Sequence, residues 1–327
     1  MRLKLTNKKP YTWLFAILLI SAGTAQAQNE QPMNYVHQEK ESFSSKLMKG
    51  VLRLARLKTL VEKNAAKAEI KQDAAHIPKK LKKKFKVEES IFLGRNVWKI
   101  TPAIPSGKTV VFLHGGAYIF NLGSFHWEFV GDMVARTGDT YLVVDYPLAP
   151  SNTMNDAHEM LTEIMKSIND EKIVFIGDSA GAGLALSFAI ENKNNDERIK
   201  ALILISPFVN VTMNNEKVDS IEPKDVMLTA KGLRAVGELY RGELDDKDPK
   251  ISPLYGDLTH LPPTSIFIGG NDILSADAVL LKAKLVDAKV ACNYYEYPKM
   301  MHDWVVFSQI KEAHGARSQI TDLINGF

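Results

Sequence analysis

The chain has 327 residues, 41 of them basic and 38 acidic, and its single cysteine, Cys292, cannot form a disulfide within the chain. Residues 1–27 hold four of the basic residues and none of the acidic ones, which leaves 37 basic against 38 acidic residues in the remainder. This balance excludes the strongly basic composition of nucleic-acid-binding proteins, so we expect no nucleic acid partner. Cys292 is expected to be a buried, small apolar residue.

The N-terminus has the three-part pattern of a secretory signal peptide. Basic residues precede an apolar run at 13–20, and Ala25-Gln26-Ala27 ends the pattern. An uncleaved membrane anchor is the alternative, but the run is shorter than the ~20 residues that a spanning helix needs. We therefore predict a signal peptide at residues 1–27, export to the periplasm or the extracellular space, and no stable membrane insertion after cleavage.

Residues 28–86 are predicted to form an N-terminal helical cap segment that ends in a basic connector. Apolar residues recur in it at helical spacing: Leu47, Val51, Leu54, Leu57 and Val61. Such a stripe is typical of a membrane-surface helix or of a cap helix that buries its apolar face, and we expect the second. The lysine-rich residues 79–86 fit either a site for anionic lipid or polymer or a solvated connector, and we expect the connector.

From residue 87 onward, strands and helices alternate without a linker. Helices are predicted at 124–137, 156–168, 180–192 and 275–288. This alternation predicts an α/β fold with a mostly parallel central sheet and helices on both faces. We therefore expect one catalytic domain at 87–327 rather than the two domains that the length alone would allow. The polar, irregular stretch at about 209–260 is expected to be a cap insertion.

The predicted strand Thr109–Leu113 runs into His114-Gly115-Gly116-Ala117. Glycines let backbone N–H groups approach a substrate oxygen without an intervening Cβ, so this turn is a candidate for the oxyanion hole. His114 has no second ligand at metal-binding spacing, so we expect no metal.

A second predicted strand, Lys172–Ile176, runs into Gly177-Asp178-Ser179-Ala180-Gly181, and a helix rich in Ala and Leu follows. A strand, a G-x-S-x-G turn and a helix make the nucleophile elbow, in which a tight turn exposes the serine hydroxyl. Ser179 is therefore the predicted nucleophile, and the N–H of Ala180 is expected to complete the oxyanion hole.

A serine hydroxyl needs a base, and in the fold that uses this elbow an acid and then a histidine follow the serine. Asp272 lies in a loop after the predicted strand Thr264–Ile268, and His302 lies five residues beyond the predicted strand Cys292–Tyr297. We predict His302 as the base and Asp272 as its partner. Asp277 is the alternative acid, whereas His314 falls in a helical stretch that we expect to end near Gly315.

The chain resembles the hormone-sensitive-lipase-like α/β-hydrolases over roughly residues 85–327. The resemblance rests on five motifs in the family's order: His114-Gly115-Gly116-Ala117, Asp145-Tyr146-Pro147-Leu148-Ala149-Pro150, Gly177-Asp178-Ser179-Ala180-Gly181, Asp272-Ile273-Leu274 and His302. Four residues depart from the usual pattern: Ala117 in place of glycine, Pro147 of arginine, Ser151 of glutamate and Ala276 of aspartate. These departures concern the subfamily and the substrate rather than the chemistry.

The resemblance implies carboxylic-ester hydrolysis by a triad of Ser179, Asp272 and His302. It also implies oxyanion donors from Gly115-Gly116-Ala117 and from Ala180. No cofactor is expected, the substrate is a small-molecule ester, and the sequence does not indicate an oligomeric state.

Short-chain esters are the expected substrates, because residues 28–86 and 209–260 should fold over the C-terminal edge of the sheet and bound the pocket. Polar residues in the second stretch also argue against a long apolar tunnel: Asn210, Thr212, Asn214 and Asn215. The alternatives are a specialised ester or lactone, such as an acetylated sugar, a macrolide or a xenobiotic, and an amidase or peptidase of the same fold. A non-catalytic binding protein and a membrane-associated structural protein are further alternatives.

Overall fold

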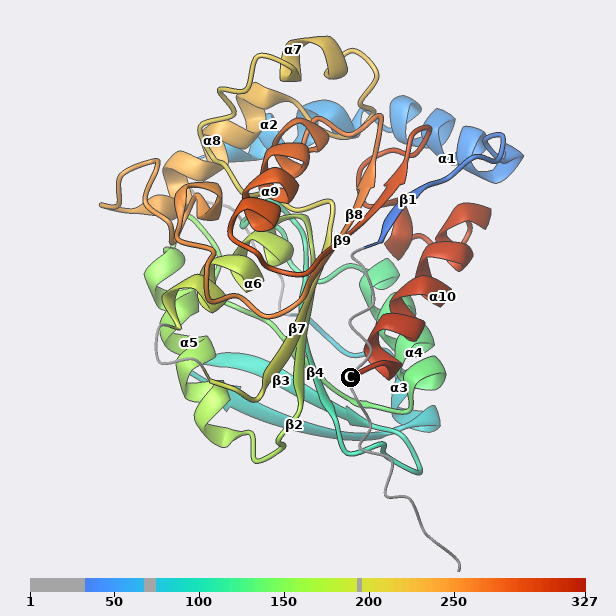
Figure 1. Ribbon diagram of the computed structural model, residues 1–327, viewed down its shortest axis with the longest axis vertical. Helices are drawn as coiled ribbons and strands as arrows, with labels where there is room; N and C mark the ends of the chain where they lie inside the picture. The colour runs from blue at the N-terminus through green and yellow to red at the C-terminus, as the bar shows by residue number, and fades with distance from the viewer. Residues whose placement is uncertain (1–32, 68–74, 193–195) are drawn as a thin grey trace, which may run out of the picture. The chain divides into compact units, whose positions relative to one another are not determined.

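A computed structural model describes residues 33–67, 75–192 and 196–327, so the predicted signal peptide at 1–27 lies outside the described residues. The described part contains a nine-stranded sheet in the order β1-β9-β8-β7-β6-β4-β5-β3-β2 (Figure 1). The strands are β1 Asn34–Val36, β2 Lys86–Phe92, β3 Arg95–Thr101, β4 Thr109–Leu113, β5 Thr140–Val144, β6 Ile173–Asp178, β7 Ile199–Ile205, β8 Thr264–Gly269 and β9 Cys292–Tyr297.

The sheet is parallel except at one edge, where β2 pairs with β3 and β3 pairs with β5 in antiparallel fashion. Every residue of β4, β5, β6 and β8 is buried, as expected for parallel strands that are covered on both faces. Successive residues of β4 enter two separate apolar cores, Val111 and Leu113 on one face and Val110 and Phe112 on the other. The predicted α/β fold class is confirmed.

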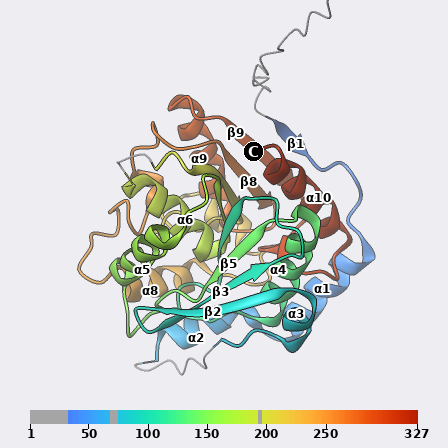
Figure 2. The same cartoon turned by 90° about the horizontal axis from the view of Figure 1, so that it is seen from below.

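Helices cover both faces of the sheet. The helices are α1 Phe43–Leu54, α2 Leu60–Ala65, α3 Lys79–Lys84, α4 Ser124–Thr137, α5 Met154–Ser167, α6 Ser179–Glu191, α7 Val218–Ile221, α8 Ala230–Arg241, α9 Ser275–Asp287 and α10 Lys311–Asn325, with 3₁₀ turns at Leu57–Thr59, Pro253–Tyr255 and Trp304–Val306. In Figures 1 and 2, α5, α6 and α9 lie on one face, and α4 and α10 lie on the other.

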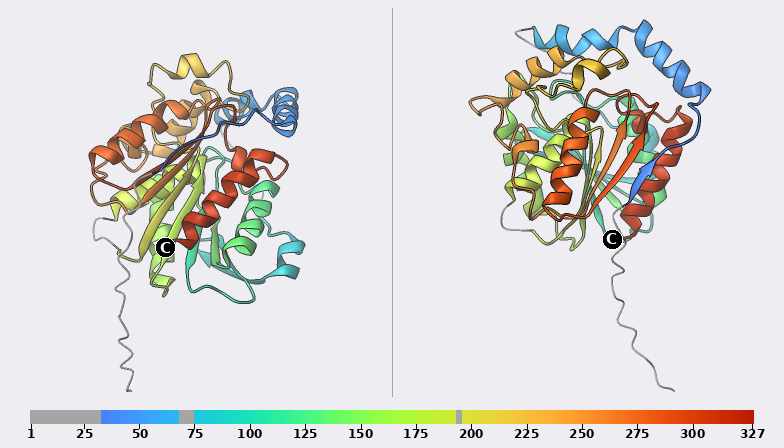
Figure 3. Two further views of the ribbon diagram at one scale, coloured as in Figure 1. Left: turned by 45° about the vertical axis from the view of Figure 1, so that its right-hand side comes forward. Right: turned by 45° about the horizontal axis from the view of Figure 1, so that its top comes forward.

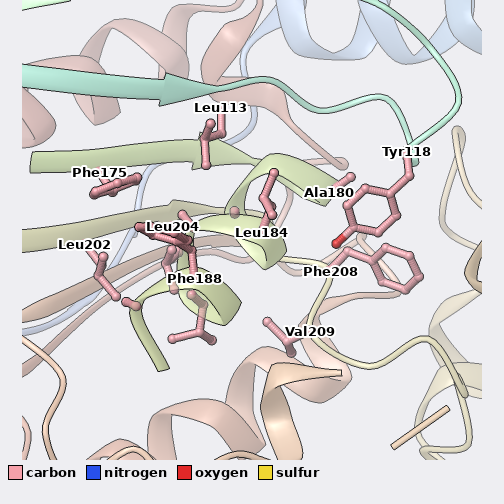
Figure 4. Packing of buried hydrophobic residues seen from close by; sticks show 14 of the residues in the cluster. Leu113, Tyr118, Phe175, Ala180, Leu184, Phe188, Leu202, Leu204, Phe208 and Val209 are labelled. Carbon is pink, nitrogen blue, oxygen red and sulfur yellow. The ribbon is translucent and has the colours of Figure 1, made fainter. Parts of the chain in front are cut away.

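The helix α6 is the most deeply buried of these helices. Its residues 179–190 are all buried, which fits a sequence that is apolar on every side. Figure 4 shows Leu184 and Phe188 of α6 beside Phe175 and Leu204 of the strands, and the rings of Phe175 and Phe188 lie 5.7 Å apart. The nucleophile elbow therefore rests on a rigid, well-packed support.

The sequence-based bounds match the core elements closely, with one error at the C-terminus. The predicted helix at 124–137 and the predicted strands at 109–113 and 292–297 agree residue for residue with α4, β4 and β9. The prediction that the last helix ends near Gly315 is wrong, because α10 continues to Asn325. Packing of Ile320 and Ile324 in the core holds that second half helical in spite of the glycine. Cys292 is buried, as predicted.

The segment 28–86 is not purely helical, which corrects one part of its prediction. Asn34–Val36 forms β1, which pairs with β9 in parallel and extends the sheet at its edge. A strand of three residues is too short to show a hydrophobic period, so β1 can be identified only from its pairing with β9. The lysines of α3 are exposed around the buried Leu81.

The remaining N-terminal helices and the insertion 209–260 lie together over one end of the sheet (Figure 3, right). The Lys58 ammonium donates to the carbonyl of Glu222, and Lys231 of α8 pairs with Glu62 of α2. Gly232 of α8 packs against Val61, where a Cβ would lie 3.4 Å from that side chain. In the part of the chain that the structure describes, no helix is both long and apolar enough to span a bilayer.

The prediction that the helix near Leu47 buries its apolar face is wrong for α1. Leu47 and Val51 point to solvent, and the buried residues of α1 are Ser45, Lys49 and Leu52. The spacing of apolar residues shows that a helix has an apolar face, but it does not show which face packs against the rest of the protein. Here polar contacts select the opposite face, since Lys49 pairs with Glu41 and donates to the carbonyl of residue 299.

Candidate active site

Ser179 is the first residue of α6, directly after β6, and it adopts a left-handed backbone conformation with φ 49°. Such a conformation is costly for a residue with a side chain, and it is typical of a nucleophile elbow. The two flanking positions must be glycine, because a Cβ at either one would collide with neighbouring backbone. A Cβ on Gly177 would lie 2.5 Å from the carbonyl carbon of Gly181, and a Cβ on Gly181 would overlap the carbonyl of Leu113.

The structure brings Ser179, His302 and Asp272 into one hydrogen-bonded row. The Oγ of Ser179 lies 3.0 Å from Nε2 of His302, and Nδ1 of His302 lies 2.9 Å from Oδ2 of Asp272. All three side chains are buried. With Nδ1–H donating to Asp272, Nε2 is free to accept the serine proton, which is the arrangement that a general base requires.

Backbone hydrogen bonds fix the orientation of Asp272. Its Oδ1 accepts the N–H of Leu274 at 2.9 Å, so the carboxylate is held at the end of β8. The alternative acid, Asp277, is engaged elsewhere, since its two oxygens accept the amides of Asn215 at 2.9 Å and Asn210 at 3.2 Å. His314 is exposed on α10 and does not line the cavity at Ser179.

The turn after β4 supplies candidate oxyanion donors. Gly115 lines the cavity and lies against Asp178, since a Cβ there would overlap Oδ2 of that carboxylate. Gly116 has φ 129°, and a Cβ there would lie 2.5 Å from the carbonyl of Phe120, so only glycine fits. Ala117 adopts φ 51° and keeps its N–H, despite the departure from glycine. Ala180 stands in the first turn of α6, where N–H groups lack helical partners.

Asp178 ties this turn to α4, a role that the sequence did not indicate. The N–H of Gly123 donates to Nδ1 of His126 at 2.9 Å, which leaves Nε2–H of His126 facing Asp178 at 3.1 Å. Burial would raise the pKa of Asp178, but His126 and the N–H of Gly115 outweigh burial and lower it. The carboxylate stays ionised and clamps the oxyanion turn in place.

A second carboxylate, missed by sequence reasoning, faces the catalytic edge of His302. Oδ2 of Asp303 lies 3.0 Å from Nε2 of His302, the same nitrogen that Ser179 approaches. The N–H of Asp303 donates to Oγ of Ser206 at 3.1 Å, and its backbone adopts φ 52°. The one signal in the sequence was that Asp303 directly follows His302. That signal is weak, because the next residue in a loop rarely contacts the catalytic edge of a histidine ring.

The two carboxylates determine the proton affinity of His302. Burial alone would lower the pKa of His302, but Asp272 and Asp303 outweigh burial and hold it well above its usual value. Burial raises the pKa of Asp303 to about 7, against the opposing pull of His302. A histidine must be neutral to act as a base, so a raised pKa moves the onset of activity to higher pH.

Replacing Asp303 with asparagine is expected to move the acid limb of the pH profile of kcat/KM to lower pH. Removing one of the two charges lowers the pKa of His302 toward its ordinary value, so neutral imidazole and activity appear at lower pH. Asparagine tolerates the left-handed backbone, so the loop should persist. Asp219→Asn, on the exposed side of α7, removes the same charge away from His302 and should leave the limb in place. An unmoved limb in Asp303→Asn would refute this role.

Asp225, in the cap insertion, is a further residue that the sequence did not indicate. Its Oδ2 accepts the N–H of Ile273 at 2.9 Å, beside Asp272, and its Oδ1 accepts the N–H groups of Met227 and Leu228. Burial, with the charge of Asp272 adding to it, raises the pKa of Asp225 to about 6. The cap is thus fastened directly to the loop that carries the catalytic acid.

A cavity of about 270 Å³ lies over Ser179 and His302. The residues that line it are mainly apolar and come from the cap, the oxyanion turn and the C-terminal loops: Leu52, Leu57, Leu60, Val61, Gly115, Gly116, Ala117, Phe120, Asn121, Gly123, Phe125, His126, Asp178, Ser179, Met227, Leu228, His302, Asp303 and Phe307. The polar residues at 210–215, whose composition argues against a long apolar tunnel, do not line this cavity, and Asn210 and Asn215 bind Asp277.

The described residues include no group of three or more His, Cys, Asp or Glu side chains that could hold a metal ion.

The chain is similar to known hydrolases in sequence and in fold. A family model described as the alpha/beta hydrolase fold matches residues 110–306. The chain is 29% identical to an esterase of Acinetobacter venetianus over 65% of this chain and 73% of that protein. It is 31% identical to a triacylglycerol lipase of Mycobacterium tuberculosis over 68% of this chain, which is 48% of the lipase. A solved esterase of the bacterial hormone-sensitive lipase family shares the fold, with a TM-score of 0.74, 21% identity, and coverage of 88% of this chain and 99% of that one.

Proposed function

Because this chain belongs to the hormone-sensitive-lipase-like α/β-hydrolases, we propose that it is an exported serine carboxylesterase that hydrolyses short-chain carboxylic esters. The observation that carries the proposal is the hydrogen-bonded row of Asp272, His302 and Ser179 beneath the cavity. A serine on a strained elbow, a histidine on its hydroxyl and a carboxylate behind the histidine together support acyl transfer.

The reaction proceeds through an acyl-enzyme. Oγ of Ser179 attacks the ester carbonyl while Nε2 of His302 takes its proton, and the N–H groups of Gly116, Ala117 and Ala180 stabilise the oxyanion. His302 then gives the proton to the departing alcohol. Water, deprotonated by His302, attacks the acyl group and releases the acid. Asp272 holds the imidazole tautomer and stabilises the imidazolium throughout.

The size and lining of the cavity support a short acyl group. Its volume of about 270 Å³ lies just below the range of small-molecule sites, roughly 300–1,000 Å³. The cap bounds it with Leu57, Leu60 and Val61, and Phe125 and Phe307 also line it. Few polar groups line it apart from the catalytic ones, which favours an apolar acyl chain over an amide or a sugar.

Acetyl to hexanoyl p-nitrophenyl esters are expected to be hydrolysed faster than dodecanoyl or palmitoyl esters, because a long chain exceeds the bounded cavity. The measurement is kcat/KM across the series, with p-nitroanilides of the same acids to test amidase activity. Emulsified long-chain triglyceride cleaved faster than a soluble butyrate ester would contradict the prediction, and so would p-nitroanilides cleaved as fast as the esters.

Two further measurements test the remaining parts of the proposal. A fluorophosphonate probe should label Ser179, as identified by peptide mass spectrometry, and failure to label it would remove the nucleophile. Export rests on the N-terminal pattern alone, so protein recovered from the periplasm or medium should begin at Gln28. Retention of the full N-terminus in the cytoplasm would contradict export.

A further inference from the structure

The outer face of α1 carries an apolar stripe whose four side chains are each more than half exposed in the described chain. Phe43, Leu47, Val51 and Leu54 are 80%, 57%, 52% and 86% exposed. At about 100° per residue, the four positions fall within about 80° of arc on the helix. The buried residues Ser45, Lys49 and Leu52 lie on the opposite side. Single exposed apolar residues are ordinary, but four in one row on one helix form a continuous patch.

The stripe is bordered by cations. Residues 43–67 contain seven basic residues and one acidic residue, Glu62, which is paired with Lys231. Lys46 and Arg53 flank the same side of the stripe, and Arg56 follows the helix; all three are exposed and form no ion pair with the described residues. An apolar row beside unpaired cations is the pattern of a helix that lies in the interface of an anionic membrane.

The same segment forms part of the wall of the catalytic cavity. The inner residue Leu52 and the following Leu57, Leu60 and Val61 all line the cavity above Ser179. In Figures 1 and 3, α1 and α2 form one edge of the cap, with α1 at the outermost position. A surface bound by the outer face of α1 would therefore lie next to the wall of the substrate site.

We propose that the outer face of α1 docks the protein on an anionic phospholipid bilayer. The four apolar side chains enter the boundary between headgroups and acyl chains, and Lys46, Arg53 and Arg56 contact the lipid phosphates. This inference goes beyond ester hydrolysis, because docking does not require Ser179 or any other catalytic residue. It places the cavity wall at the membrane, where esters that partition into lipid are concentrated.

Vesicle sedimentation tests the proposal. The purified protein is used as its cells process it, with its N-terminus read by mass spectrometry, and vesicles contain phosphatidylglycerol and phosphatidylcholine at 1:1 or phosphatidylcholine alone. Binding to the anionic vesicles should be at least about tenfold tighter than to the neutral ones, and it should weaken at least about tenfold as salt screens the cations. Equal binding to both vesicles would overturn the proposal.

Matched variants locate the surface. Leu47→Gln, Val51→Gln and Leu54→Gln together keep helix propensity and should weaken anionic-vesicle binding at least about tenfold, while hydrolysis of a soluble butyrate ester stays unchanged. The control places the same change on the exposed side of α9, with Val279→Gln, Leu280→Gln and Val286→Gln, and should bind like the parent. If the triple variant loses its butyrate activity, the single variant Leu54→Gln replaces it in the binding measurement.

A second copy of the chain is the alternative occupant of this face. Analytical ultracentrifugation of the parent and of the α1 triple variant distinguishes the two occupants. A parent dimer that becomes a monomer in the α1 triple variant, with unchanged vesicle binding, would overturn the membrane proposal. A parent and variant of the same mass, with binding lost only in the α1 variant, would support it.

Discussion

Ser179→Ala is expected to leave a folded protein whose kcat for p-nitrophenyl butyrate is at least about 10⁴-fold below that of the parent. The triad residues act as a unit, so removing the nucleophile removes the benefit of His302 and Asp272 as well. The residue lies on a rigid elbow between β6 and α6, and a methyl group at Cβ preserves that packing. Pre-steady-state kinetics with excess ester should also show no acyl-enzyme burst.

The chain offers a close control in Ser187, eight residues along the same helix. Ser187 is also buried beside a histidine, with its Oγ 2.7 Å from Nε2 of His158, but it donates to the carbonyl of Lys250. Burial lowers the pKa of His158 to about 3, and no carboxylate faces it in the described chain. Ser187→Ala should therefore retain activity within a few-fold. Ser179→Ala activity within tenfold of the parent would refute the assignment of the nucleophile.

Asp272→Asn is expected to lower kcat by about 10⁴ at nearly constant shape. The amide cannot stabilise the imidazolium, and it favours the wrong tautomer of His302, so Nε2 no longer accepts the proton of Ser179. Folding should persist, because the Asn carbonyl still accepts the N–H of Leu274 that orients the loop. The measurement is kcat at saturating butyrate ester, with circular dichroism to confirm the fold.

Asp277→Asn is the matched control for the acid, since Asp277 lies one turn into α9 and is equally buried. Its carboxylate is bound by the amides of Asn210 and Asn215 rather than by His302. The substitution should reduce stability through these contacts and cost far less in turnover. The reverse order of the two variants would reassign the acid.

The fold and the chain positions of the site residues could be predicted because both depend on short-range sequence patterns. Buried parallel strands read as runs of Val, Ile, Leu and Phe, and β4, β6 and β8 stand out for this reason. The elbow constrains its own sequence, since Gly177 and Gly181 have no room for a Cβ. Chain order and positions after predicted strands then favoured Asp272 and His302 over Asp277 and His314, and the structure places both within 3.0 Å of their contacts.

Tertiary packing decided what no local pattern encodes. Which side of α1 packs depended on polar contacts of Lys49 with distant groups, so the apolar stripe faces solvent although its spacing suggested burial. The contact of Asp303 with His302, the packing of Asp178 against Gly115 and the clamp of Asp225 on the acid loop each depend on loop conformation or on distant segments. Sequence spacing defines the period of an element and the strain of a turn, whereas orientation and pairing depend on the free energy of the whole packed chain.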